Sequence, residues 1–205
     1  MAGYSDVKAV TITADTVALD ADGISVATSV GNNAALVIGG ALASGGAVAL
    51  SHGRIVTILS AGNDSGKSFT VVGTDVNGAA QTESITGANA GTATGAVFFL
   101  SIASITAVGN PAGNVSAGVN ASAADVIFAG RSRLKGIFLT STATAGTVDF
   151  LKNSPTGTSI LGLSSVGDAD ATRDVVIPDE GVLFVDGIYI EYTVSTFLTM
   201  TVFHA

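Results

Sequence analysis

Residues 54–87 decide the fold that we expect, and they read RIVTILSAGNDSGKSFTVVGTDVNGAAQTESITG. Residue pattern and composition predict β-strands over Arg54–Ser60, Ser68–Asp75 and Gln81–Gly87. Between the last two segments, Asn77-Gly78 predicts a hairpin with a type I′ turn, since both central residues of that turn need a positive φ angle. The stretch therefore predicts a three-stranded β-meander.

The composition of the whole chain favours the same class. Charged residues make up only 12% of the 205 residues, hydrophobic residues make up 47%, and there are 26 glycines. The apolar residues are mostly Ala, Val and Ile mixed with Thr and Ser, and β-branched side chains suit a pleated sheet better than a helix. Low charge with high apolar content argues against disorder. We therefore expect a folded all-β chain.

Charge and targeting signals exclude several classes of partner. The net charge is −8, and neutralising nucleic-acid phosphates needs a basic face, so we expect no nucleic-acid partner. The first ten residues, MAGYSDVKAV, lack the basic and apolar regions of a secretory signal. The longest apolar stretch, Ala96–Val108, is too short to span a bilayer, so we expect no membrane partner. The absence of cysteine excludes disulfides and thiolate chemistry.

The spacing of strands and turns predicts two tandem antiparallel β-sandwich or jelly-roll-like domains with negligible helix. The first is expected over residues 1–122, with a Gly/Ala-rich part over 1–50 and a meander region over 54–119. The polar residues 120–126, NASAADV, predict a linker. The second domain, residues 123–205, offers seven short strands at the spacing of a small sandwich: Arg131–Ser141, Gly146–Lys152, Ser159–Ser164, Arg173–Ile177, Gly181–Phe184, Gly187–Val194 and Phe197–Phe203.

The first domain carries further expected elements. Residues 7–19 predict an edge strand with a break near Ala14-Asp15, and Asp20-Ala-Asp22-Gly23 predicts a turn. The same D-x-D-G begins a calcium-loop pattern, but its downstream Glu is missing because position 31 is Gly. Four more strands are expected in the domain, around Leu36–Ile38 and Val48–Leu50, over Val97–Val108, and as a last short strand at Val115–Val119.

Ala61–Ser68, AGNDSGKS, matches a permissive phosphate-loop pattern in which Ala replaces the first Gly. A phosphate loop needs a helix after its Lys, so that backbone N–H groups point at the phosphates. Here Lys67 is followed by SFTVVGTD, which is dense in β-branched residues and has no helical stripe. We therefore interpret this segment as a hairpin turn rather than a nucleotide site.

The sequence contains few residues that could form another kind of catalytic or metal-binding site. The only histidines are His52 and His204, which predicts exposed or packing side chains rather than a Ser-His-Asp group or a metal site. The carboxylates lie mainly in or beside turns, where they cap backbone N–H groups. Paired glycosidase acids are unsupported because there is no Trp and there are only three Tyr residues. We expect no catalytic residue, no cofactor and no metal.

Three basic residues, Arg131, Arg133 and Lys135, recur at every second position. On a strand all three would project from one face, because successive side chains point to opposite sides. They could contact an acidic partner surface, or they could be an ordinary solvated strand face. The pattern leaves both interpretations open.

Two stretches resemble virion structural proteins of tailed bacteriophages. One runs from AGNDSGKSFTVVGTDVNGAAQTESITG to FFLSIASITAVGNPAGNVSAGV, and the other is AGRSRLKGIFLTSTATAGTVDF with IPDEGVLFVDGIYIEYT and MTVFHA. Together they cover residues 54–119 and 129–205. The resemblance implies a capsid decoration, or cement, protein on the virion surface. It would bind the major capsid protein as a homo-oligomer, with a trimer favoured, and tie neighbouring capsid subunits together.

A low-charge chain rich in Gly, Ala and Thr is compatible with that expectation, because assembly covers exposed strand edges. Two alternatives stay open. The chain could be a tail, fibre or head-surface component that binds a host receptor. It could also be an enzyme, either a nucleotide hydrolase using Lys67 or a glycan hydrolase.

Overall fold

The computed structural model describes residues 6–205, and every regular element in that range is a β-strand. The paired strands are antiparallel, which confirms the expected all-β class with negligible helix. The chain forms two compact units, which we describe separately. The terminal unit joins Ala124–Ala205 to the N-terminal segment up to Val17, and the central unit is Ala18–Ala123. Met1 to Ser5, which we assigned to the first domain, lie outside the described residues.

Fifteen strands occur within residues 6–205: β1 Lys8–Thr13, β2 Asp20–Ser29, β3 Ala43–Ser44, β4 Ala47–Ser60, β5 Ser68–Thr74, β6 Ala80–Thr86, β7 Thr92–Val108, β8 Asn114–Phe128, β9 Ser132–Ser141, β10 Ala145–Lys152, β11 Ser159–Val166, β12 Thr172–Val176, β13 Val182–Phe184, β14 Ile188–Thr193 and β15 Phe197–His204. The seven strands expected beyond residue 130 all form, with bounds that differ by one or two residues.

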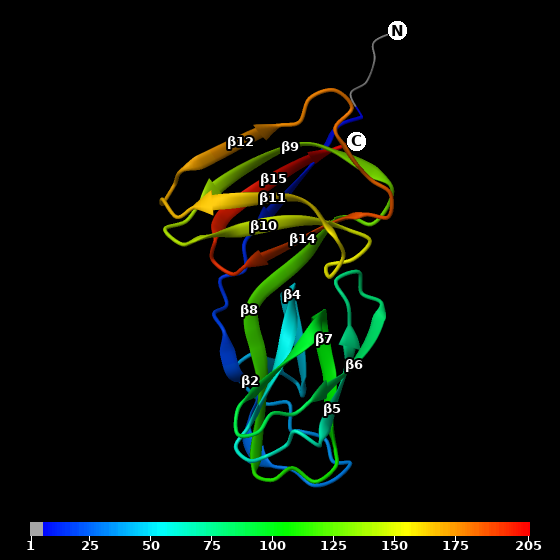
Figure 1. The fold of residues 1–205 in the computed structure, drawn as a ribbon, viewed down its shortest axis with the longest axis vertical. Helices are drawn as coiled ribbons and strands as arrows, with labels where there is room; N and C mark the ends of the chain where they lie inside the picture. The colour runs from blue at the N-terminus through cyan, green and yellow to red at the C-terminus, as the bar shows by residue number, and fades with distance from the viewer. Residues whose placement is uncertain (1–5) are drawn as a thin grey trace. The chain divides into compact units, whose positions relative to one another are not determined.

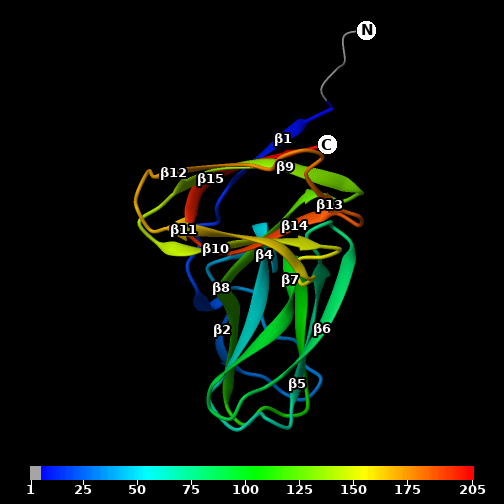
Figure 2. The same ribbon diagram turned by 45° about the horizontal axis from the view of Figure 1, so that its top comes forward.

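The terminal unit is a sandwich of two layers (Figure 1). One sheet has the order β1-β15-β9-β12, with β13 also paired to β9. The facing strands follow the order β11-β10-β14, continued by β8. Apolar side chains between the layers are fully buried, among them Leu134, Phe150, Ile190 and Val202. Figure 2, in which β1 and β13 are also labelled, shows the same two layers turned toward the viewer.

The N-terminal strand belongs to the terminal unit, so the expected first domain of residues 1–122 is wrong at its start. β1 is an edge strand as expected, but it pairs with β15, with Lys8 opposite His204 and Thr13 opposite Thr199. Residues 7–13 have the alternation of an edge strand, and any sheet with a free edge could accept such a segment. Local sequence therefore predicted the strand but not its neighbour.

The expected linker at residues 120–126 is also wrong, because these residues continue strand β8. The boundary between the two units falls within this strand, between Ala123 and Ala124. Small and polar composition suggested a linker, yet Ala123 and Ala124 are both fully buried. Small and polar residues therefore did not mark a linker in this chain.

The strands of the central unit form one hydrogen-bonded series in the order β8-β4-β7-β5-β6, with β2 paired to β8 and β3 to β4. The expected meander is therefore wrong: β7 lies between β4 and β5, which are consecutive in the sequence. The core of this unit is a cluster of buried apolar residues that includes Phe69, Phe99, Ile102 and Ile105. A long strand such as β7 can pair with a neighbour on each side. The pattern of residues within the strand does not show which strands those neighbours are.

The Gly-rich segment departs from expectation in three places. Leu36–Ile38 is not a strand, although Leu36 is buried and its backbone N–H bonds to the carbonyl of Ile105. Val48–Leu50 belongs to the single strand β4 that continues to Ser60. Residues 20–23, predicted as a turn, begin strand β2, where the N–H of Asp22 bonds to Asp20 Oδ1 at 3.1 Å.

The hairpin predicted at Asn77-Gly78 joins β5 to β6, but the expected type I′ turn is wrong. Only Gly78 has a positive φ angle, +79°, and Asn77 does not. The N–H of Gly78 bonds to the carbonyl of Asp75, and that of Asp75 to the carbonyl of Ala79. This is a three-residue loop that ends in a Gly with a left-handed backbone conformation. Such loops are the next most common hairpin connection after two-residue turns. Asp75 Oδ1 stabilises it by accepting from the N–H groups of Asn77 and Ala79.

Candidate functional site on the terminal unit

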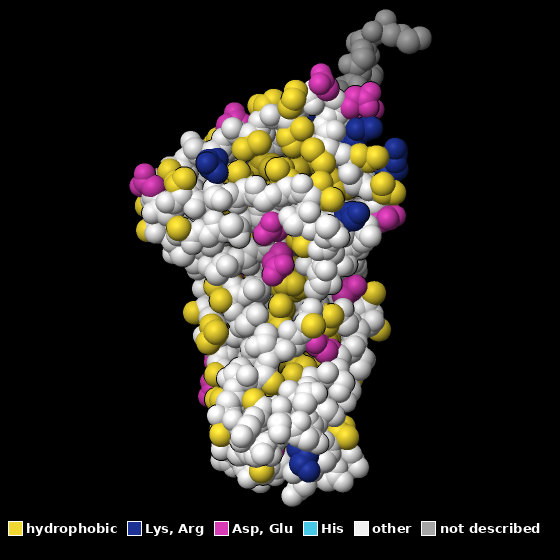
Figure 3. Space-filling view, viewed as in Figure 1, with side chains coloured by type: hydrophobic (Ala, Val, Ile, Leu, Met, Phe, Trp, Pro, Cys, Tyr) yellow, Lys and Arg dark blue, Asp and Glu magenta, His cyan; other side chains and the backbone are white. Residues whose placement is uncertain are grey.

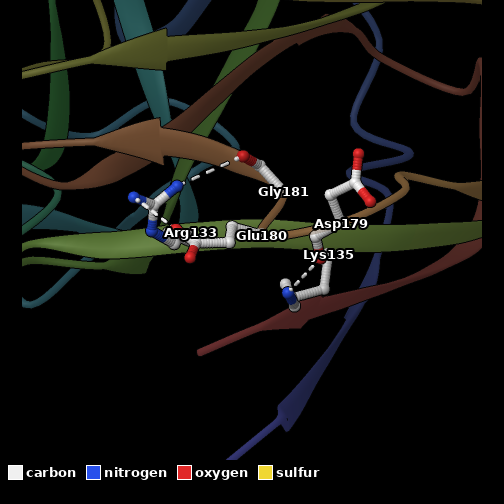
Figure 4. Close-up of polar contacts among 5 residues, drawn as sticks. All are labelled: Arg133, Lys135, Asp179, Glu180 and Gly181. Carbon is white, nitrogen blue, oxygen red and sulfur yellow. Dashed lines mark hydrogen bonds and ion pairs between the residues drawn. The ribbon is translucent and has the colours of Figure 1, made fainter.

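The basic residues singled out in the sequence lie at the beginning of β9. Arg133 and Lys135 flank Leu134, which is fully buried, and Arg131 precedes the strand. Lys135 lies where the register of β9 against β15 shifts, between Leu134 and Gly136. The side chains of Arg133 and Lys135 turn toward the 178–181 turn of the same unit (Figure 4). Arg133 Nη2 lies 3.2 Å from Glu180 Oε2, and Lys135 Nζ donates to the carbonyl of Asp179 at 2.9 Å. The structure therefore gives Arg133 an acidic neighbour and Lys135 a backbone acceptor within the same turn.

Beyond this pair, the outer face of the sheet β1-β15-β9-β12 is nearly free of charge. Strand register aligns its outward side chains in three rows across four strands. One row is entirely threonine, and the other two mix Thr, Phe, Ala, Gly and Val with one carboxylate. The rows are Thr13-Thr199-Thr140-Thr172, Thr11-Thr201-Phe138-Asp174 and Ala9-Phe203-Gly136-Val176. We call these twelve residues the threonine face.

Several members of the threonine face are strongly exposed. Val176 is 77% exposed and Phe138 is 40% exposed, and the hydroxyls of Thr11 and Thr201 lie 2.9 Å apart. Hydrophobic atoms gather over this unit in Figure 3, with isolated Lys and Arg side chains among them. Solvated sheet faces usually carry many charged residues, so a face of Thr and apolar side chains has the composition of a contact surface. The sequence signal was present as Thr-x-Thr at 11–13 and 199–201, but only the register joins the two.

The segment that matches a phosphate loop has the wrong surroundings for phosphate. Lys67 is followed by strand β5 and not by a helix, as the sequence predicted. The hairpin expected there is wrong, because β4 and β5 are not neighbours in the sheet. Asp64 is fully buried, and its Oδ1 accepts from the N–H of Ala112 at 2.7 Å. A buried carboxylate inside the loop would repel a phosphate, so the loop serves to connect strands.

The two histidines differ in their surroundings. His52 lies within β4. His204, at the end of β15, is buried, and its ring packs on that of Phe128 with the ring centres 5.1 Å apart. Its Nδ1 lies 2.9 Å from Ser132 Oγ. Burial, and secondarily the positive charge of Lys8, lower the pKa of His204 below its ordinary value of 6.5. The expectation of a packing histidine is thus confirmed for His204.

Sequence reasoning missed that His204 and Ser132 line a pocket of about 210 Å³. They are 72 residues apart in the chain and meet because β15 pairs with β9. The remaining lining side chains carry both charges and one aromatic ring: Asp6, Lys8, Phe128 and Arg131, with Ala205 beside them. All of them belong to the terminal unit.

Comparisons with known proteins identify no relative. No family model matches the chain, and neither the curated proteins nor the solved structures contain a significant match. Within residues 6–205, no helix is long and apolar enough to cross a membrane. Among the same residues, no group of three or more His, Asp or Glu side chains is arranged to hold a metal ion.

Proposed function

We propose that this chain is a non-enzymatic virion structural protein of the capsid decoration type. It binds the outer shell of a tailed bacteriophage through the major capsid protein and stabilises the shell by bridging capsid subunits. The proposal draws on the resemblance of residues 54–119 and 129–205 to phage structural proteins. The structural observation that carries it is the threonine face, which offers an exposed, weakly charged surface for another protein.

The chemistry of the threonine face suits a protein partner. Threonine methyl groups and the rings of Phe138 and Phe203 can be buried at little desolvation cost, since apolar burial is favourable. Threonine hydroxyls can form hydrogen bonds across an interface and so fix its register. Asp174 is the only charge in the three rows, so few charges would need a partner.

The proposal includes assembly of the chain with itself, with a trimer favoured. Within residues 6–205, the outer strands of the sheet are β1 and β12, each paired on one side only. An open strand edge is a template for pairing with another chain, and proteins usually cover or charge such edges. Symmetric assembly would cover them.

The test is co-sedimentation with capsids of the phage that encodes the chain, together with analytical ultracentrifugation of the free protein. Val176→Lys places a charge on the threonine face and should abolish capsid binding while leaving the melting temperature unchanged. Val37→Lys is the matched control, because Val37 is 71% exposed on the central unit. A wild-type monomer that never sediments with capsids would overturn the proposal.

The second candidate is a head-surface or tail component that binds a host receptor. The exposed aromatic and threonine side chains of the threonine face are also suited to recognition. Fluorescently labelled protein that adheres to host cells in the absence of capsids would favour this function. The Val176→Lys and Val37→Lys pair would then show whether the same face mediates adhesion.

A further inference from the structure

The pocket beside His204 has features that the proposed function does not use. It opens at one end of the terminal unit, where inward-facing residues of β1, β9 and β15 meet Phe128 of β8. A volume of about 210 Å³ holds a ligand the size of several water molecules, each of which takes about 30 Å³ in the liquid.

The hydrogen bonds at Ser132 define the state of the His204 ring. Ser132 Oγ donates to the carbonyl of Ala205 at 3.1 Å. A hydroxyl has one hydrogen, and a carbonyl oxygen can only accept. With that hydrogen given to Ala205, Ser132 Oγ accepts from the Nδ1–H of His204 in the neighbouring 2.9 Å contact, which is the tautomer that the binding test checks. The neutral ring is then left with a lone pair on Nε2, which can accept from a ligand.

Two cations and a ring complete the pocket. Lys8 and Arg131 both line it, and among residues 6–205 neither side chain forms a hydrogen bond or an ion pair. Lys8 is close enough to His204 for its charge to act on the ring. The ring of Phe128, 37% exposed, gives the pocket an apolar wall. Among the lining side chains, Asp6 carries the carboxylate, so the side chains supply two cations and one anion while His204 is neutral.

We propose that this pocket binds a small organic anion that carries its own hydrogen-bond donor, such as a hydroxycarboxylate or a phosphate monoester in its monoprotonated form. The negative group lies between Lys8 and Arg131. The donor of the ligand bonds to Nε2 of His204, and its carbon skeleton lies against Phe128. Charge-assisted contacts of this kind are the strong ones in a small site.

The binding test uses phenyl phosphate as the probe, with phenol as the uncharged control, in low-salt buffer near pH 6, where about half of a phosphate monoester is monoprotonated. Titration is followed by calorimetry and by the ring nitrogen signals of His204. We expect a free ring with hydrogen on Nδ1, saturable binding of phenyl phosphate, a shift of the Nε2 signal on binding, and no binding of phenol. A free ring with hydrogen on Nε2, or no phenyl phosphate binding at millimolar concentration, would overturn the proposal.

Two matched variants locate the site. Arg131→Gln removes an exposed cation of the pocket and should weaken phenyl phosphate binding at least tenfold. Arg133→Gln removes a cation of the same strand end that contacts Glu180 and does not line the pocket, so binding should be unchanged. Equal loss in both variants would show only general attraction to a positive surface, and equal retention in both would exclude the pocket. Either result contradicts the proposal that the pocket binds a small anion. Neither result tests the proposed binding to capsids.

Discussion

The hydroxyl of Tyr192 accepts a hydrogen bond from the backbone N–H of Asp15 at 3.1 Å and donates one to Asp125 Oδ2 at 3.1 Å. Tyr192 is buried, and its ring packs on that of Phe197 with the ring centres 4.9 Å apart. Burial, followed by the charge of Asp125, raises the pKa of Tyr192, so the hydroxyl keeps its proton. Tyr192 thereby connects the segment after β1 to the rest of the terminal unit.

We expect Tyr192→Phe to destabilise the protein by about 1–3 kcal/mol, because the buried N–H of Asp15 loses its acceptor. Urea denaturation measures the loss, and hydrogen exchange should show that the Asp15 amide becomes less protected. Thr201→Val is the control, since it removes a hydroxyl from the exposed Thr11–Thr201 pair and should change stability by less than about 0.5 kcal/mol. Unchanged exchange at Asp15 in Tyr192→Phe would contradict this role.

The contact between residues 15 and 192 also shows which features a single sequence can predict. Alternation and turn residues predicted the strands near 8–13, 68–74 and 197–204, because those signals depend on neighbours two to four residues away. Which strand pairs with which depends on packing between distant segments. The sequence therefore predicted a meander over residues 54–87, whereas β7 inserts between β4 and β5.

The candidate sites divide in the same way. Strand alternation predicted that Arg133 and Lys135 point away from Leu134, but their contacts with Glu180 and with the carbonyl of Asp179 depend on the pairing of β13 with β9. The threonine face and the pocket beside His204 each combine residues from both ends of the chain. Neither could be predicted before the pairing of β1, β15 and β9 was known.

The loop that matches a phosphate loop provides a second prediction. Asp64→Ala should destabilise the protein by about 1–3 kcal/mol, because the N–H of Ala112 would lose its acceptor. Lys67→Ala should cost less than about 1 kcal/mol, since the half-buried stem of Lys67 contributes only packing. Thermal unfolding with and without ATP and magnesium measures both effects. A stabilisation by ATP that Lys67→Ala abolishes would contradict the structural role of the loop.

The hairpin at residues 75–79 provides a third prediction. Gly78→Val should cost at least about 1–2 kcal/mol, because a β-branched residue is strained at a φ angle of +79°. Steric crowding does not cause this loss of stability, since a Cβ added at Gly78 would meet nothing within 4 Å. Gly78→Asn should be tolerated better, because Asn adopts left-handed conformations more readily. Gly66→Ala is the control, with equal space and no positive φ angle. Equal stability of the Val and Asn variants in urea would contradict the strain.

A fourth prediction concerns Glu191, which lies directly opposite Asp149 in the pairing of β14 with β10. Burial, and then the charge of Asp149, raise the pKa of Glu191. Like charges on opposite strand positions are destabilising, so Glu191→Gln should stabilise the protein at pH 7 by up to about 1 kcal/mol. Below the ordinary pKa of 4.5 the two proteins should become equally stable, because Glu191 is then protonated. A gain that persists at pH 4 would indicate packing rather than charge.

The pH dependence of His204 is the last prediction, and its sign is opposite to that of Glu191. The folded chain keeps His204 neutral, whereas the unfolded chain protonates it near pH 6.5, so the unfolded state binds more protons in the range below that pH. The stabilising contribution is therefore complete above pH 6.5 and is lost as the pH falls toward the lower pKa of the folded state. The charged side chains that line its pocket are Lys8, Arg131 and Asp6, and Lys8→Gln removes the cation that acts on the ring. Nuclear magnetic resonance titration should show a pKa for His204 below 6.5, which rises in Lys8→Gln but stays below 6.5 because burial is the larger cause. A pKa that is unchanged in Lys8→Gln would mean that burial alone sets the protonation of His204.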